Sequence, residues 1–172
     1  MATDPFELYP MISQIAAAFA GFGSLASGIG RRRRGGDDAR MDAYRLENML
    51  VCSLSATLLG LFPATIANLS GSDRVGVHFS AVLALIAILI YTPPSIVRAR
   101  RLRHVPGFSM HATIVNSLCI WGAFLVFLTC VSGVLPGQEQ ALYLLGLLGL
   151  VGSSIMLFSR VIVSMLSPYH QG

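Results

Sequence analysis

The sequence predicts an all-α, polytopic membrane protein, a bundle of five transmembrane helices, and three observations lead to this fold class. Of the 172 residues, 54% are hydrophobic and only 12% are charged, whereas an ordinary soluble domain carries roughly 25% charged residues. A soluble fold of this length could not bury so much apolar surface, because a core grows slowly with chain length. The apolar residues also fall in runs of about 20 or more, the length that crosses a bilayer as a helix and far too long for barrel strands.

Five segments meet the length of a transmembrane helix, and we expect the whole chain, 1–172, to form a single integral membrane domain. The connections between the segments are short, which leaves no room for a separate soluble domain. The predicted helices cover approximately residues 8–30, 46–69, 77–97, 111–135 and 141–166.

The arginines predict how these helices are threaded. All twelve basic residues are arginine, and ten of them lie in two stretches, 31–45 and 98–103. Cytoplasmic loops of membrane proteins are enriched in basic residues, so we expect a bacterial-type inner membrane with the N-terminus outside and the C-terminus cytoplasmic. The arginines expected at the cytoplasmic face, in contact with anionic lipid headgroups, are Arg31, Arg32, Arg33, Arg34, Arg98, Arg100, Arg101, Arg103 and Arg160.

The run of four arginines that begins at Arg31 also excludes two other classes of function. A secretory signal places its positive charge before its apolar segment, whereas this run follows the first predicted helix. Nucleic-acid-binding proteins carry basic patches with interleaved aromatic residues on a soluble fold. The sequence therefore predicts a membrane boundary here and no nucleic-acid partner.

Small residues recur at four-residue spacing on the first and last predicted helices. Such faces let two helices approach closely in lipid, where packing replaces the hydrophobic effect. Two interpretations stay open, packing within this bundle and a subunit interface, and the small face of the last helix would suit that of the first. The residues are Ala16, Ala17, Ala20, Gly21, Ser24 and Gly28 on the first helix and Gly146, Gly149, Gly152 and Ser153 on the last.

Polar side chains inside the predicted spans are the candidate site residues. Most such residues make one hydrogen bond between helices, but a set of them could also line a polar path at a subunit interface. The candidates are Gln14, Asn48, Ser55, Asn116 and Ser117.

Prolines and one acidic residue predict local features. Pro63 removes one backbone hydrogen bond and is expected to kink the second helix. Pro93 and Pro94 are expected to break or bend the third helix shortly before its arginines. Glu47 lies near Arg45, with which we expect a surface ion pair.

No constellation of catalytic or metal-binding residues is apparent in the sequence. All eight acidic residues fall in tails, loops or helix ends, the four histidines are scattered, and the three cysteines form neither a CxxC pair nor a zinc set. We therefore expect no catalytic residue, no metal and no cofactor. A carboxylate or other ionisable group deep in the membrane, typical of coupled transporters, is not present in the predicted spans either.

These observations predict a small non-enzymatic protein of the inner membrane that acts through helix–helix contacts, as an oligomer or as an accessory subunit of a larger membrane complex. The alternative is a homo-oligomeric channel or facilitative transporter for a small solute or ion. Such a channel would need several copies, because five short-looped helices make a thin bundle. An enzyme that acts on lipid is a distant third hypothesis.

Overall fold

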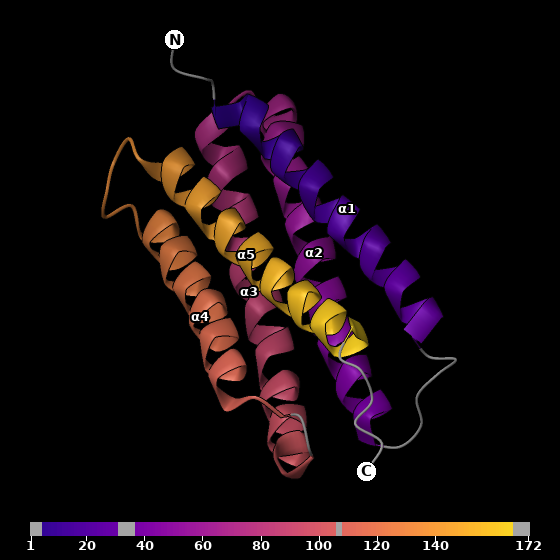
Figure 1. Ribbon diagram of the computed structural model, residues 1–172. Coiled ribbons are helices and arrows are strands. Elements are labelled where there is room, and N and C mark those ends of the chain that lie inside the picture. Colours follow the sequence, from indigo (N-terminus) through magenta and orange to yellow (C-terminus); the bar gives the residue numbers. More distant parts are fainter. Residues whose placement is uncertain (1–4, 31–36, 106–107, 167–172) are drawn as a thin grey trace, which may run out of the picture.

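Five long helices form an up-and-down bundle in the computed structural model of the protein (Figure 1). The structure describes residues 5–30, 37–105 and 108–166, with side chains for 6–25, 40–105 and 108–163. The described helices are α1 (Pro5–Gly30), α2 (Asp37–Ser70), α3 (Asp73–Arg101), the short 3-10 helix η1 (Leu102–His104), α4 (Met110–Ser132) and α5 (Glu139–Leu166). Each of the five α-helices contains a segment long and apolar enough to span a membrane. The predicted all-helical fold with five membrane-length helices is confirmed.

The helices extend beyond the apolar segments that predicted them. α2 begins at Asp37 and α3 continues to Arg101, because backbone hydrogen bonding does not stop where the side chains become polar. Pro93 and Pro94 do not break the helix, since α3 runs through both without interruption. The expected bend at these prolines stays a prediction. Membrane-length helices tolerate proline because neighbouring helices and hydroxyl side chains can satisfy the backbone groups that it releases.

Two glycines with left-handed backbone end helices where the chain must turn at once. Gly71 has a φ of +69°, and its N–H donates to the carbonyl of Ala67 at 2.8 Å, which closes α2 only two residues before α3 begins. Gly133 caps α4 in the same conformation, with a φ of +66°. A residue with a Cβ adopts this conformation at a cost, so both reversals depend on glycine.

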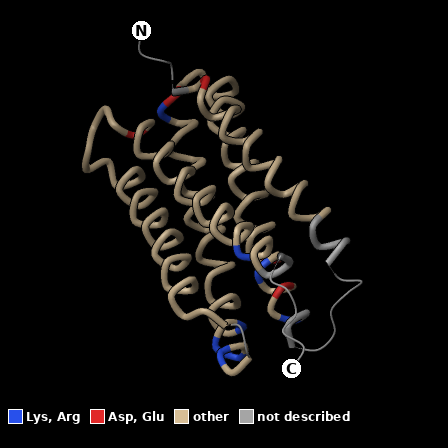
Figure 2. Tube along the Cα trace, in the orientation of Figure 1, with Lys and Arg blue, Asp and Glu red and all other residues tan. Residues whose placement is uncertain are grey.

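The helices alternate in direction, so α1, α3 and α5 end where α2 and α4 begin (Figure 1). Figure 2 shows that arginines gather at this end, at the start of α2 and near the ends of α3 and α5. We call it the arginine end. The opposite end carries acidic residues in the first turns of α1, α3 and α5, together with Arg74, which pairs with Glu139 at 3.3 Å. Arg31, Arg32, Arg33 and Arg34 lie outside the described residues.

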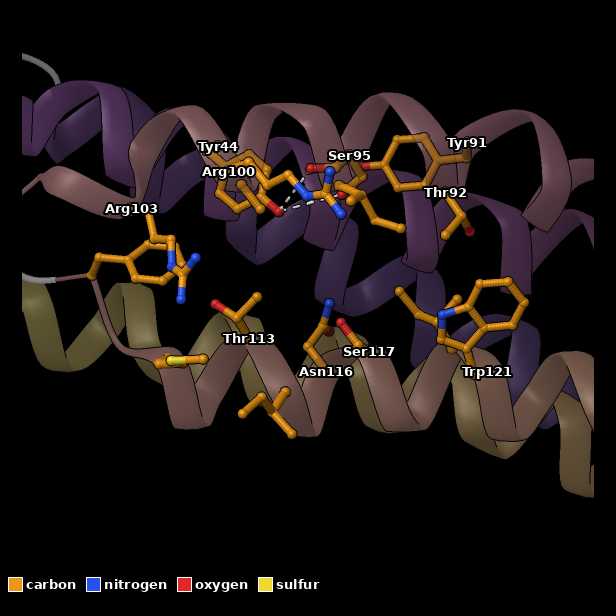
Figure 3. Close-up of a pocket in the computed structure, with 16 residues that line it drawn as sticks. Tyr44, Tyr91, Thr92, Ser95, Arg100, Arg103, Thr113, Asn116, Ser117 and Trp121 are labelled. Atoms are coloured by element: carbon orange, nitrogen blue, oxygen red, sulfur yellow. Dashed lines mark hydrogen bonds between the residues drawn. The ribbon is translucent and has the colours of Figure 1, made fainter.

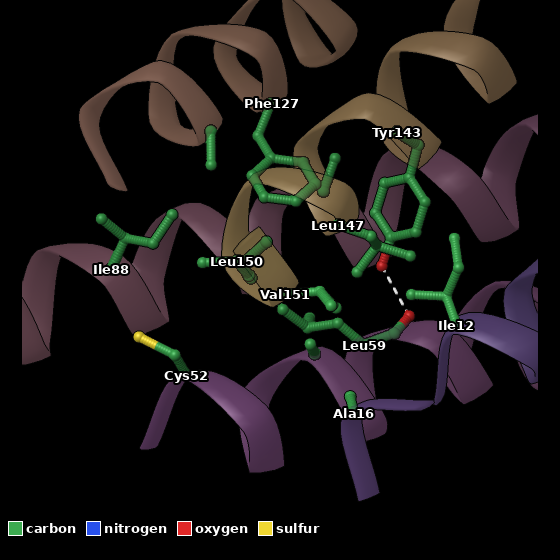
Figure 4. Close-up of a cluster of buried hydrophobic side chains, with 14 of the residues drawn as sticks. Ile12, Ala16, Cys52, Leu59, Ile88, Phe127, Tyr143, Leu147, Leu150 and Val151 are labelled. Carbon is green, nitrogen blue, oxygen red and sulfur yellow. Dashed lines mark hydrogen bonds between the residues drawn. The ribbon is translucent and has the colours of Figure 1, made fainter. Parts of the chain in front are cut away.

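α2 and α5 form the centre of the bundle. α2 packs against α1, α3 and α5, and α5 packs against the other four helices. In Figure 1, α1 and α4 lie on opposite flanks of this central pair. The interior between them is apolar and aromatic, and Figure 4 shows Phe127 and Tyr143 with Leu147 within it.

Pro63 on α2 and Tyr143 on α5 together explain how these two central helices are joined. Pro63 has no N–H, so the carbonyl of Leu59, four residues earlier in α2, loses its normal helical donor. The hydroxyl of Tyr143 on α5 donates to this carbonyl at 2.6 Å (Figure 4). Tyr143 is fully buried, so its polar atom and the released carbonyl satisfy each other in a region that excludes water.

The small residues of α5 pack against α4. A Cβ at Gly146 would lie 2.5 Å from the ring of Phe127, and one at Gly149 would lie 3.1 Å from the Cβ of Ala123. The expectation that the glycine face of α5 meets α1 is therefore wrong. Rotation of each helix about its own axis decides this pairing, and the glycine spacing does not determine that rotation. A Cβ at Gly152 would meet nothing within 4 Å.

The small residues of α1 divide between two faces. Ala16 and Ala20 are buried in the bundle, whereas Ala17 and Gly21 are exposed. Ser24 is exposed and donates to the carbonyl of Ala20 at 2.9 Å. Gly28, also predicted for packing, lies where side-chain surroundings are not described.

We predict that Tyr143→Phe lowers the free energy of unfolding, by about 1–3 kcal/mol, because it leaves the carbonyl of Leu59 buried without a donor. In a Pro63→Ala background the backbone N–H at position 63 restores that donor, so the same change should cost clearly less. A double-mutant cycle of unfolding in mixed micelles measures this coupling. An equal cost of Tyr143→Phe in both backgrounds would contradict the interpretation.

Candidate functional site

A cavity of about 280 Å³ lies between α3 and α4 at the arginine end (Figure 3). Tyr91, Thr92 and Ser95 line it from α3, and Tyr44 on α2 closes one side. The residues that line it from α4 include Thr113, Asn116, Ser117, Ile120 and Trp121. The cavity therefore combines polar groups with an apolar, aromatic inner end.

Hydrogen bonds to Asn48 position the α3 wall. The side-chain carbonyl of Asn48 on α2 accepts hydrogen bonds from the hydroxyls of Tyr91 and Ser95, the latter at 2.9 Å. The Tyr44 hydroxyl lies 3.3 Å from the hydroxyl of Ser95 and donates to its backbone carbonyl at 3.4 Å. The hydroxyls of Tyr91 and Ser95 on α3 bond to Asn48, and the hydroxyl of Tyr44 bonds to Ser95. Together these contacts hold α2 and α3 in a fixed register.

Two buried polar atoms beside these hydrogen bonds have no partner. The Nδ2 atom of Asn48 and the Oγ1 atom of Thr92 are each inaccessible and make no hydrogen bond. Thr92 lines the cavity, and Asn48 lines a smaller adjoining space of about 40 Å³ between α2, α4 and α5. An unpaired buried polar group costs free energy, so both atoms are unfavourable points in an otherwise satisfied set of hydrogen bonds.

The α4 wall is fixed by a second amide. The side-chain carbonyl of Asn116 accepts a hydrogen bond from the hydroxyl of Ser153 on α5. Ser153 is fully buried, and its predicted packing role therefore includes a polar contact. Asn116 lines both the cavity and the smaller space, so it separates them together with Tyr44 and Thr113.

Arginines give the mouth of the cavity a positive charge. Arg100 and Arg103 line it, and neither forms an ion pair with a residue in the described part of the chain. Arg160 on α5 donates to the hydroxyl of Ser109, the N-cap of α4, at 3.2 Å. A group with negative charge at this mouth would meet two uncompensated guanidinium groups.

Other charges at this end are neutralised by different partners than expected. Glu47 pairs with Arg98 on α3, and Arg45 pairs with Asp42 at 3.3 Å. The expected pair of Glu47 with Arg45 is therefore wrong. Residues two positions apart on a helix do not face each other, whereas those three apart do.

The five polar candidates from the sequence do not share one site. Asn48, Asn116 and Ser117 come together at the cavity and the space beside it. Ser55 lines a different small space of about 20 Å³, deeper between α2 and α3. Gln14 lies exposed on α1, on the opposite flank of the bundle (Figure 1).

Sequence reasoning missed the polar residues of α3. The segment Tyr-Thr-Pro-Pro-Ser contains Tyr91, Thr92 and Ser95, but only its two prolines were used for a prediction. The usable signal was the spacing of Tyr91 and Ser95, four residues apart and therefore on one helix face. In the described parts of the chain, no group of three His, Cys, Asp or Glu side chains is placed to hold a metal ion.

We predict that Asn48→Leu destabilises the protein by about 1–3 kcal/mol, because the hydroxyls of Tyr91 and Ser95 lose their shared acceptor. Asn68→Leu is the matched control, since Asn68 lies exposed on the same helix and should change little. The free energy of unfolding in mixed micelles compares the two variants. Equal stability of both would show that the hydrogen bonds to Asn48 contribute nothing measurable.

No protein-family model, curated protein or solved structure matches the chain. What the protein does must therefore be inferred from its own geometry and charge.

Proposed function

We propose that this is a small non-enzymatic protein of a bacterial-type inner membrane that acts through helix–helix contacts, and that copies of it associate through the outer face of α1. The single observation that carries this proposal is the position of Gln14. Its side chain is exposed on a helix whose candidate membrane span runs from Phe6 to Leu25.

Gln14 lies well inside that span. It is eight residues from Phe6, which corresponds to about 12 Å at the helical rise of 1.5 Å per residue. An amide without a hydrogen-bond partner is unfavourable in hydrocarbon. A side chain at this depth therefore favours a partner outside the protomer.

A second copy of the chain supplies a suitable partner. An amide group carries both donors and an acceptor, so two Gln14 side chains related by a twofold axis can each donate to the other. Ala17, Ala18 and Gly21 lie exposed on the same side of α1. A Cβ at Gly21 would meet nothing within 4 Å, so a neighbouring helix has room to approach closely.

The channel alternative has less support from these positions. A path at a subunit interface would need Gln14 and the other polar candidates on one outward surface. Asn48 is only 3% exposed and is held inside the protomer, on the far side of α2 from α1. Beyond the cavity, the fully buried Phe127 and Tyr143 fill the bundle, which suits a cavity closed at one end.

The arginine end supplies the proposed orientation. Arginines in the last turn of α3, at the start of α2 and near the end of α5 meet at one end of the bundle (Figure 2). Basic residues favour the cytoplasmic side of a membrane, where anionic headgroups attract them. We therefore propose that this end faces the cytoplasm and that α1 begins on the opposite side.

We predict that Gln14→Leu and Gly21→Leu each reduce the native oligomer to a monomer, because one removes the shared hydrogen bond and the other blocks close approach. Gly122→Leu is the matched control. Gly122 is an exposed glycine on α4 with open space around it, and its substitution should leave the oligomer intact. Native mass spectrometry of protein released from lipid nanodiscs gives the copy number directly.

Two results would overturn self-association through α1. A native protein that is monomeric at every protein-to-lipid ratio would do so, as would equal disruption by Gly122→Leu. A fixed complex with a different membrane protein that is lost in the Gln14 and Gly21 variants would instead make α1 the contact face of an accessory subunit.

A further inference from the structure

The cavity between α3 and α4 reaches the outer surface of the bundle. Ile96, Ile114 and Trp121 line it and are also exposed, by 39%, 47% and 43%. Its volume of about 280 Å³ is near the lower limit of small-molecule sites, about 300 Å³. A space of this size and opening has room for the polar part of an amphiphile, with an exit for an apolar part sideways between the two helices.

Groups of different chemistry follow one another along this cavity, as Figure 3 shows. Arg103 and Arg100 lie at the mouth, with Arg100 extending toward Ser95. Thr92 and Trp121 lie at the opposite, inner end. The order from cationic through hydroxyl-bearing to aromatic matches the order of phosphate, ester and acyl chain in a phospholipid that stands along the membrane normal.

The two arginines are available for an anion. Arg98, on the same turn, is engaged by Glu47, while Arg100 and Arg103 have no acidic partner among the described residues. The planar guanidinium fork binds phosphate oxygens in a bidentate manner, which makes arginine the preferred residue for such contacts.

Thr92 provides a second, independent indication of a ligand. It is only 8% exposed, and its hydroxyl has no hydrogen-bond partner. Other helical threonines of the chain, such as Thr57 and Thr113, donate to the carbonyl four residues earlier. The Thr92 hydroxyl does not, so this buried hydroxyl in the cavity wall is left without a partner.

We propose that this cavity is a binding site for one anionic phospholipid. Arg100 and Arg103 hold its phosphate, Thr92 donates to an ester carbonyl, and the acyl chains leave past Trp121. This inference goes beyond the proposed function, because the site lies on the opposite flank from α1 and does not depend on association between copies.

The chain contains a single tryptophan, and its place at the cavity makes its fluorescence a reporter of occupancy. The probes are phosphatidylglycerol and phosphatidylcholine with brominated acyl chains, each a minor component of phosphatidylcholine nanodiscs, because bromine quenches tryptophan only on contact. At equal mole fraction, we expect brominated phosphatidylglycerol to quench Trp121 at about tenfold lower concentration than brominated phosphatidylcholine. Equal quenching by the two lipids in the unmodified protein would overturn the proposal without any variant.

The variants Arg100→Gln and Arg103→Gln test the proposed phosphate contacts. Phosphatidylglycerol has a net negative charge, whereas the choline cation of phosphatidylcholine offsets its phosphate. Each variant removes one guanidinium that favours the net negative headgroup, so each should weaken the preference for phosphatidylglycerol about tenfold. Arg101→Gln is the matched control, because it removes the same charge from the same helix end but does not line the cavity. An equal effect of Arg101→Gln would show attraction to the whole surface and overturn a specific site.

Two further measurements separate the lipid from other ligands. Thr92→Val should weaken quenching by both phospholipids, since both carry ester carbonyls, while leaving their ratio unchanged. Inorganic phosphate added to the buffer should not restore Trp121 fluorescence. If it displaces the brominated lipid, the site binds free phosphate and the assignment to a lipid is wrong.

Discussion

A polar group buried in this bundle is costly without a partner, and the carbonyl of Leu59 is the clearest case of one that finds its partner on another helix. Pro63 deprives it of a helical donor, and the hydroxyl of Tyr143 replaces that donor at 2.6 Å. The missing hydrogen bond within α2 is thus replaced by a hydrogen bond between α2 and α5, the two central helices. Because α1, α3 and α4 all pack against this pair, their positions depend on how α2 and α5 are joined.

Hydrogen bonds of buried polar groups also join α2 to α1 and α3. The hydroxyl of Ser13 on α1 donates to the backbone carbonyl of Thr57 at 3.0 Å. Toward α3, Asn48 accepts from two hydroxyls. α2 therefore makes at least one polar contact with each adjacent helix. Apolar packing alone is weakly directional in lipid, and these contacts fix the register that packing leaves open.

Hydropathy and charge predicted the five helices and the end at which the arginines gather, because both are properties of short segments. They could not predict which way each helix faces. α4 is apolar nearly all round, and its contact with Gly146 and Gly149 depends on a rotation that no local pattern specifies. Asn116 was recognised as polar, but its bond to Ser153, 37 residues away, depends on the tertiary arrangement. The cavity combines both difficulties, since its walls depend on how α3 and α4 are rotated toward each other and on Tyr44 from α2.

The two halves of the bundle have different side-chain volumes, and this difference explains where the cavity lies. Away from the arginine end, Tyr9, Phe127 and Tyr143 are fully buried, and their rings meet edge-on or tilted with centroids about 5.5 Å apart. Toward the arginine end, the residues of α3 and α4 that line the cavity include several small or polar ones, namely Thr92, Ser95, Ala99, Thr113, Asn116 and Ser117.

Small side chains of this kind cannot fill the space between two helices, and a void in an apolar wall would be costly. Here the wall is held open by the hydrogen bonds of Asn48 and Ser95, so the space persists without apolar filling. A polar, preformed cavity next to uncompensated arginines is favourable only when something occupies it. The unpartnered hydroxyl of Thr92 in its wall therefore supports the proposed ligand, and the proposed contact face of α1 lies on the other flank of the bundle.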